Sequence, residues 1–279
     1  MTYIGYSLGC TIGAMAMSNP EIGNFIKQKT EQAIFLGPYV YPELTEDKYF
    51  LEAPIEYLKD FQESYEKWEV HNWAFGSFRT DHSWMWLQLA LYKKHRFCFF
   101  MSNLSKLTPN LQLFSIGVKE FWRLIFGPGH RFLDGISTKV AIHLYQLSKK
   151  SWKNKTRKIR IDNDKDNFEY FQNTKGEIIK KIEMRWYDHG NDKTNQEKYG
   201  TTKPPEYDLS TINIPVHFIC GACDLNCNEK SGRYLADRVS EAGYGDIVQI
   251  YNIPYYKHVD FVMPYDVRPL HEIFDKIFG

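Results

Sequence analysis

Short apolar runs alternate with helical spacing near the beginning of the chain. Residues 1–5 form a strand-like run, and residues 8 to about 18 carry the spacing of a helix that Asn19-Pro20 ends. Ala33–Leu36 is a second short apolar run, closed by Gly37-Pro38. This alternation predicts parallel strands covered by helices.

The same alternation returns after residue 207. Strand-like runs cover Ile214–Cys220 and Asp246–Pro254, and helical spacing covers Ser231–Ala242 and Val267–Phe278. The apolar residues of the last segment fall on one helical face. We therefore predict an α/β fold in which both ends of the chain contribute to one parallel sheet.

The stretch between these ends, residues 41–207, has a different pattern. Aromatic residues are dense, charges are interspersed and helical spacing dominates, so we predict a large, mainly helical insertion. Within it, residues 149–160 hold seven basic side chains around Trp152, and Asp162, Asp164 and Asp166 follow. Aromatic and basic side chains together can grip nucleic-acid bases, but the adjacent acidic residues favour a solvated loop.

Composition narrows the class of protein. The 279 residues are 43% hydrophobic and 16% aromatic, which is too apolar for a disordered chain. The formal net charge of +1 gives no reason to expect a nucleic acid or an anionic membrane as partner. No apolar run approaches the roughly 18–20 residues of a transmembrane helix. We expect a globular chain without a transmembrane segment.

The five cysteines are too few for a disulfide framework. Cys220, Cys223 and Cys227 have the spacing of three metal ligands, but no fourth cysteine or histidine stands nearby at zinc-site spacing. Buried small side chains at a strand end are the preferred interpretation, and no metal is expected. Two N-x-S/T triplets, at Asn103 and Asn154, are formal glycosylation acceptors.

Gly5-Tyr6-Ser7-Leu8-Gly9 matches the G-x-S-x-G pattern and stands between a predicted strand and a predicted helix. In this pattern the serine occupies a strained turn, and the flanking glycines let the neighbouring backbone pass close by. The helix N-terminus then stabilises negative charge on a reacting oxygen. Ser7 is therefore the candidate nucleophile.

A serine nucleophile needs a base and an acidic residue that orients the base, in the chain order Ser, Asp or Glu, His. Asp224 follows the strand that ends at Cys220, and His258 follows the strand that ends at Pro254. Carboxyl ends of parallel strands share one rim, so Ser7, Asp224 and His258 are expected together there. Asp260 is either a residue that supports the site residues from behind or a simple helix-entry carboxylate.

At these residues the chain resembles the acid lipase family, which includes gastric and lysosomal acid lipases. Residues 5–12 are similar to its G-H-S-Q-G-T-T elbow, with Tyr6 and Leu8 in place of the usual His and Gln. The family's segments P-P-x-Y, G-G-x-D, P-x-Y-x-H-x-D-F and H-W-x-Q are matched by Lys203–Leu209, Gly221–Asp224, Pro254–Phe261 and His143–Gln146.

This resemblance implies the C-terminal part of an α/β-hydrolase fold with core segments 1–40 and 208–279 and a helical cap at 41–207. It implies hydrolysis of carboxylic esters of neutral lipids at a lipid–water interface, in a secreted or lysosomal setting, without metal or organic cofactor. Ser7 would be the nucleophile, His258 the base and then the acid, and Asp224 its orienting residue. The backbone N–H of Leu8 would be one oxyanion donor.

The family places roughly its first third upstream of the elbow strand, including a signal peptide and an H-G loop that supplies the second oxyanion donor. We therefore expect a partial or truncated lipase sequence. One alternative is a catalytically impaired or non-enzymatic product that binds lipid or protein. Another is an esterase or peptidase on the same fold, because a triad fixes acyl transfer but not the acyl group.

Overall fold

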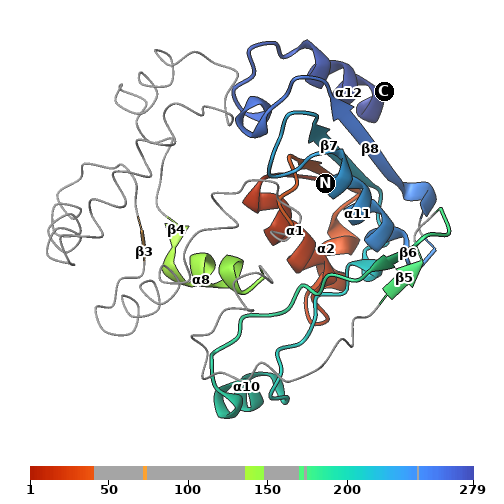
Figure 1. The fold of residues 1–279 in the computed structure, drawn as a ribbon. Helices are drawn as coiled ribbons and strands as arrows, with labels where there is room; N and C mark the ends of the chain where they lie inside the picture. The colour runs from red at the N-terminus through yellow and green to blue at the C-terminus, as the bar shows by residue number, and fades with distance from the viewer. Residues whose placement is uncertain (41–71, 74–135, 148–169, 173–174, 244) are drawn as a thin grey trace, which may run out of the picture.

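The computed structural model describes residues 1–40, 72–73, 136–147, 170–172, 175–243 and 245–279. The largest sheet in this part of the chain has four parallel strands in the order β1-β2-β7-β8 (Figure 1). Their bounds are Thr2–Tyr6, Gln32–Leu36, Val216–Gly221 and Val248–Ile253. The predicted α/β class is confirmed, and both ends of the chain contribute to one sheet, as expected.

Alternate residues of the central strands face two different layers. On one face, side chains of β2 and β7 such as Phe35 and Phe218 pack with α1 (Leu8–Ser18) and α11 (Glu229–Ser240). On the other face, Ile34, Leu36 and Ile219 pack with α12 (Arg268–Phe278). Since both faces are covered, β2 and β7 are apolar along nearly their whole length, as buried parallel strands are.

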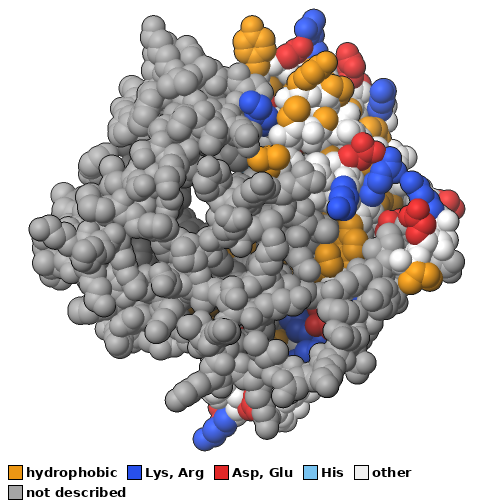
Figure 2. Space-filling view, in the orientation of Figure 1, with side chains coloured by type: hydrophobic (Ala, Val, Ile, Leu, Met, Phe, Trp, Pro, Cys, Tyr) orange, Lys and Arg blue, Asp and Glu red, His pale blue; other side chains and the backbone are white. Residues whose placement is uncertain are grey.

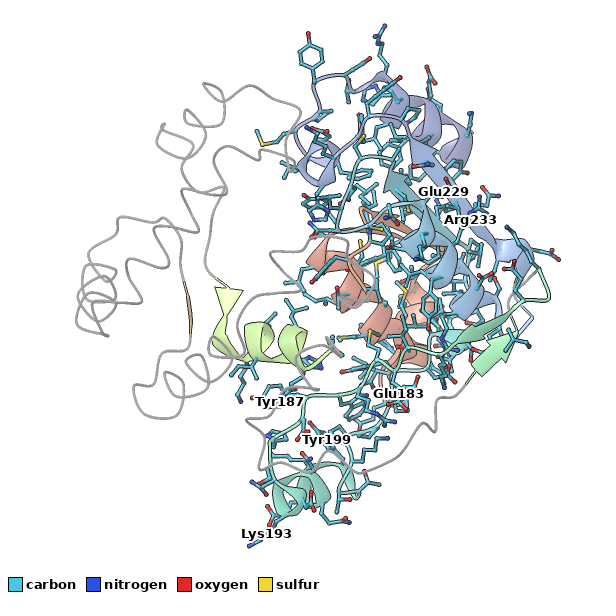
Figure 3. All side chains as sticks on the ribbon, in the orientation of Figure 1. Glu183, Tyr187, Lys193, Tyr199, Glu229 and Arg233 are labelled. Atoms are coloured by element: carbon cyan, nitrogen blue, oxygen red, sulfur yellow. The ribbon has the colours of Figure 1, made fainter. Side chains whose placement is uncertain are left out.

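Local sequence fixes where the flanking helices begin. Before α11, the side chain of Asn228 accepts a hydrogen bond from the Ser231 backbone N–H, satisfying one donor of the first turn. Glu229 and Arg233 then pair one turn apart on its exposed side (Figure 3). At the start of α12, Pro269 occupies the first turn, where its missing N–H costs nothing.

Residues 175–207 pack beside the sheet and hold a further helix. Gln146, the last residue of α8 (Thr138–Gln146), donates to the Asp188 carbonyl at 2.7 Å and accepts from the Asp188 N–H at 3.0 Å. Near α10 (Asp192–Tyr199), the Tyr199 hydroxyl donates to the Tyr187 carbonyl at 2.7 Å (Figure 3). The two hydrogen bonds between the Gln146 side chain and the Asp188 backbone thus connect segments that lie about forty residues apart in sequence.

An ionic network connects residues 175–207 to α11. Glu206 lies 3.2 Å from the Lys181 ammonium and 3.7 Å from the guanidinium of Arg238, which is 1% exposed. Glu241 contacts the same guanidinium. Burial raises the pKa of Glu206, against the opposite effect of the two cations. Arg238, the buried cation of α11, is therefore paired with carboxylates from two segments of the chain, those of Glu206 and Glu241.

The remaining elements are short. They are α2 (Gly23–Lys29), β3 (Asn72–Trp73), β4 (Ile136–Ser137), β5 (Tyr170–Gln172), β6 (Ile178–Lys180) and the 3₁₀ turns η3 (Leu209–Thr211), η4 (Gly245–Ile247) and η5 (His258–Phe261). No helix in the described ranges is long and apolar enough to cross a membrane. On the face drawn in Figure 2, acidic and basic side chains stand beside hydrophobic ones over the described part.

Several expectations fall outside the described residues. Most of the predicted insertion, the basic run at 149–160 and both glycosylation triplets, at Asn103 and Asn154, lie there. The boundaries 1–40, 41–207 and 208–279 therefore stay predictions, as does the helical character of the cap.

Candidate active site

Ser7 lies in the sharp turn between β1 and α1. Its backbone has φ 51° and ψ −115°, a region that a non-glycine residue occupies only under constraint from its surroundings. The Ser7 N–H donates to the Leu36 carbonyl and the Ser7 carbonyl accepts from the Cys10 N–H, both at 3.0 Å. The turn is thereby fixed to the end of β2 and to the first turn of α1.

The two glycines of the motif have different surroundings. A Cβ at Gly5 would stand 3.0 Å from the backbone of Cys10 and of Gly9, so the helix passes over this position at contact distance. A Cβ at Gly9 would meet nothing within 4 Å. Close backbone approach therefore requires glycine at Gly5, while the same expectation is wrong for Gly9.

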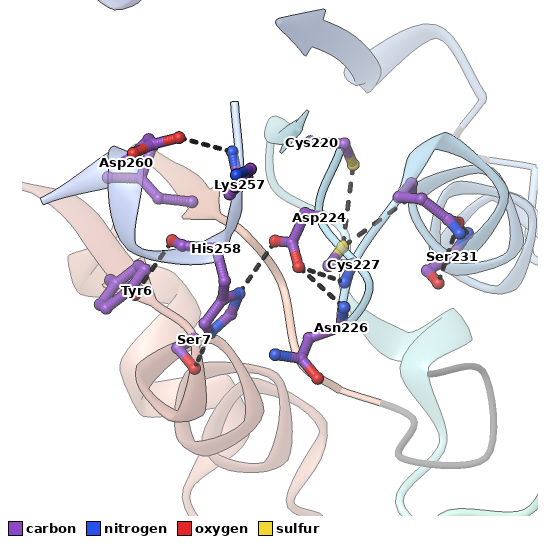
Figure 4. Close-up of polar contacts among 12 residues, drawn as sticks. Tyr6, Ser7, Cys220, Asp224, Asn226, Cys227, Ser231, Lys257, His258 and Asp260 are labelled. Atoms are coloured by element: carbon purple, nitrogen blue, oxygen red, sulfur yellow. Dashed lines mark hydrogen bonds and ion pairs between the residues drawn. The ribbon is translucent and has the colours of Figure 1, made fainter. Parts of the chain in front are cut away.

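The structure brings Ser7, His258 and Asp224 together at the carboxyl ends of β1, β7 and β8 (Figure 4). Nε2 of His258 lies 2.7 Å from Oγ of Ser7, and Nδ1 lies 2.9 Å from Oδ2 of Asp224. Both distances are within hydrogen-bond reach. A nucleophile, a base and a residue that orients the base thus form one continuous chain of contacts.

The surroundings of Asp224 determine the tautomer of His258. Oδ1 of Asp224 accepts from the backbone N–H groups of Asn226 at 2.8 Å and Cys227 at 3.0 Å, and the side chain is fully buried. A carboxylate only accepts hydrogen bonds, so Nδ1 of His258 must donate to it. In the neutral imidazole Nε2 is then the acceptor, and it faces the hydroxyl of Ser7.

His258 opens the 3₁₀ turn η5 after β8. Oδ2 of Asp260 accepts from the Lys257 N–H at 2.7 Å, so this carboxylate closes the turn that presents the histidine. Gly37, at φ 51° after β2, lies beneath the site, where a Cβ would stand 3.3 Å from Oδ2 of Asp224. The same Cβ would stand 3.1 Å from the Phe261 ring, and the positive φ would strain any side chain other than glycine's hydrogen at this position.

Sequence reasoning missed one residue of the site. The Tyr6 hydroxyl donates to the His258 carbonyl at 3.0 Å, and the two rings lie 5.3 Å apart between centroids. A tyrosine at the variable position of the elbow pattern carries no sequence signal for this contact, because its partner is 252 residues away.

Leu8 is the first residue of α1, so its N–H has no carbonyl of a preceding helical turn to bind. Such an N–H, directly after the nucleophile, is suited to an oxyanion. Its position is thus compatible with the predicted role.

The cysteines near the site do not converge as ligands. Cys220 and Cys227 are buried with sulfurs 3.9 Å apart, and Cys10 is buried beside β1, whereas Cys223 is exposed. Burial raises the pKa of the Cys10 and Cys227 thiols, which keeps them protonated. Within the described ranges, no group of three His, Cys, Asp or Glu side chains is suited to a metal ion.

Two comparisons find similar proteins, and no protein-family model matches the chain. A 91-residue stretch is 30% identical to "Triacylglycerol lipase 2" of Arabidopsis thaliana, covering 31% of this chain and 21% of the plant protein. A crystal structure of Paleococcus ferrophilus monoacylglycerol lipase aligns with a TM-score of 0.46 at 12% identity, over 99% of this chain and 66% of that one. The fold assignment rests on this chain's own parallel strand order, on the helices that cover both faces of the sheet, and on the strand-to-helix turn that carries Ser7.

Proposed function

We propose that this protein is a serine ester hydrolase that acts on carboxylic esters of neutral lipids through an acyl-enzyme at Ser7. The observation that carries the proposal is the unbroken contact chain Ser7–His258–Asp224 at a strained strand-to-helix turn. The lipid ester as substrate class is supported by the aligned plant triacylglycerol lipase and by the motifs shared with acid lipases.

In this mechanism Nε2 of His258 takes the proton of the Ser7 hydroxyl as Oγ attacks the ester carbonyl carbon. The Leu8 N–H donates to the oxygen that becomes negatively charged. The intermediate then collapses, the His258 proton goes to the departing alkoxide, and the alcohol leaves with the acyl group bound to Oγ. A water molecule then attacks the acyl carbon while Nε2 of His258 takes its proton. As this second intermediate collapses, the bond from the acyl carbon to Oγ breaks, Oγ of Ser7 recovers the proton from His258, and the carboxylic acid leaves.

Asp224 contributes by orientation and charge. Its carboxylate accepts a hydrogen bond from the Nδ1 proton of His258, so that Nε2 remains able to accept the Ser7 proton. The same carboxylate stabilises the imidazolium that forms during each proton transfer. Its own two backbone donors fix its carboxylate while this happens.

The first test is labelling with a fluorophosphonate, with the modified peptide located by mass spectrometry. We expect labelling at Ser7 that Ser7→Ala abolishes and His258→Ala slows by at least about 1,000-fold. Ser210→Ala is a matched control, because this serine bonds within its own turn before β7. Folded wild-type protein that stays unlabelled at Ser7 would contradict the proposal.

A second assay addresses the substrate class. The same variants are compared on a triacylglycerol emulsion, a monoacylglycerol and a sterol ester, with a short soluble ester as reference. Turnover of the lipid esters that depends on Ser7 is expected. Turnover of the soluble ester alone would refute the lipid part of the proposal and keep the serine chemistry.

A further inference from the structure

Tyr6 stands where the nucleophile turn and the histidine turn meet. It is the last residue of β1, and its ring packs with the cluster on the α12 face of the sheet. Its hydroxyl donates to the His258 carbonyl at 3.0 Å, and its ring lies over the imidazole with 33° between planes. One side chain therefore contacts both the backbone and the ring of the candidate base (Figure 4).

The sheet alone does not hold His258 near Ser7. β1 and β8 are the two outermost strands of the order β1-β2-β7-β8, three strand spacings or about 14 Å apart. The turn after β8 must therefore reach across the ends of β7 and β2. Besides the contact between Nε2 and Oγ themselves, the bond from Tyr6 is a direct polar link from β1 to this turn.

The hydroxyl of Tyr6 is a dependable donor. Burial raises the pKa of the Tyr6 phenol, and Asp224, Cys10 and Asp260 raise it further. The phenol therefore stays protonated over the pH range in which ester hydrolases work, so its bond to the carbonyl persists.

We propose that Tyr6 is a positioning residue for His258, holding the turn of the base against the strand of the nucleophile so that Nε2 stays in reach of Oγ. This inference rests on the proposed serine chemistry. Without the hydroxyl, the imidazole samples a wider range of positions and spends less time at 2.7 Å from Oγ. The bond-forming step slows, while the affinity for the acyl portion of the substrate stays the same.

The test compares Tyr6→Phe with Tyr3→Phe. Tyr3 is a matched control, because it lies on the same strand and its hydroxyl also donates to a backbone carbonyl, that of Gly9, at 2.6 Å. Its ring packs on the opposite face of the sheet, against Phe35. Both variants lose one phenol–carbonyl hydrogen bond, so a comparable decrease in Tm is expected for each.

Fluorophosphonate labelling, measured against reagent concentration, separates the maximal rate from reagent affinity. We expect Tyr6→Phe to lower the maximal rate about five- to tenfold at unchanged affinity, and Tyr3→Phe to stay within about twofold of wild type. Tyr6→Met, which also removes the ring, is expected to lower the maximal labelling rate further than Tyr6→Phe does. Equal rates for the two Phe variants, or a loss confined to affinity, would overturn the positioning role.

A second readout does not depend on activity. The Nδ1 proton of His258, assigned by its absence in His258→Ala, is followed by NMR for its exchange with solvent. We expect this exchange to be about fivefold faster than wild type in Tyr6→Phe and unchanged from wild type in Tyr3→Phe. Unchanged exchange in Tyr6→Phe would overturn the inference even where Ser7 is labelled. Wild-type protein that is never labelled but shows the expected exchange would instead refute the proposed function alone.

Discussion

At the scale of single residues, the two oxygens of Asp224 have separate partners, and this makes one substitution diagnostic. In Asp224→Asn, the amide oxygen can keep both backbone donors, those of Asn226 and Cys227. The amide NH₂ then faces Nδ1 of His258 and forces the imidazole proton onto Nε2. We expect the rate of Ser7 labelling to fall by about 10³–10⁴-fold with little change in Tm.

Asp208→Asn provides the control for this prediction. The Asp208 carboxylate also accepts hydrogen bonds in a tight turn, from the backbone and hydroxyl of Ser210, but it lies before β7 at the other end of that strand. The Asp208→Asn protein is expected to be labelled at Ser7 at the wild-type rate. An Asp224→Asn protein that labels at the wild-type rate would argue against the tautomer assignment.

The three candidate residues were predictable from the sequence because each follows a strand, in the chain order that a triad requires. Tyr6 and the role of Asp260 were not, since they depend on how the turn after β8 lies over β1. The position of that turn depends on the order of the strands in the sheet. The apolar pattern of a strand predicts that the strand exists but not which strands pair with it.

At the scale of elements, the strand-to-helix turn predicts opposite effects for its two glycines. Gly5→Ala pushes a methyl group against the backbone of α1 and should lower the free energy of unfolding by about 1–3 kcal/mol. Gly9→Ala meets open space in the first turn of the helix and should raise it by about 0.4–1 kcal/mol. Urea denaturation of both variants checks the pair. Equal destabilisation by both would contradict the close packing at Gly5.

Element prediction worked for the strands of the sheet and for the longer helices, and it failed for a short helix. The helix from Leu8 to Ser18 has the predicted ends, and each of the four strands of the sheet overlaps its predicted run, with ends that differ by at most two residues. α2, seven residues long, was not predicted, because the break at Asn19-Pro20 was followed by too few residues for a helical repeat. The last strand begins at Val248, two residues later than expected, because η4 precedes it.

At the scale of the whole molecule, the buried His217 and the half-buried His143 make stability depend on pH. Burial lowers the pKa of His217, which stacks on Tyr251 in the sheet, and of His143, whose Nε2 contacts the Arg185 carbonyl. The unfolded chain then binds protons below pH 6.5 more readily than the folded protein. The contribution of these two histidines to the free energy of unfolding should be constant well above pH 6.5 and decrease as the pH falls below it.

Each histidine can contribute at most about 1.4 kcal/mol per pH unit to this decrease. Denaturation between pH 7.5 and about 5 measures it, and His143→Gln with His217→Gln should flatten the curve relative to wild type. His271→Gln on the exposed side of α12 should leave the slope unchanged. A slope that survives the double substitution would show that other groups cause it.

The pairing of β2 with β7 places Leu36 beside Ile219, although the ribosome makes β7 long after β2. At about 5–20 residues per second, roughly 10 to 40 s separate the two strands. During that time the apolar edge of β2 has no β7 to bind, and a site that joins residue 7 to residue 258 does not exist. We therefore expect an aggregation-prone state during synthesis, and a yield of active molecules that depends on chaperone supply and translation speed.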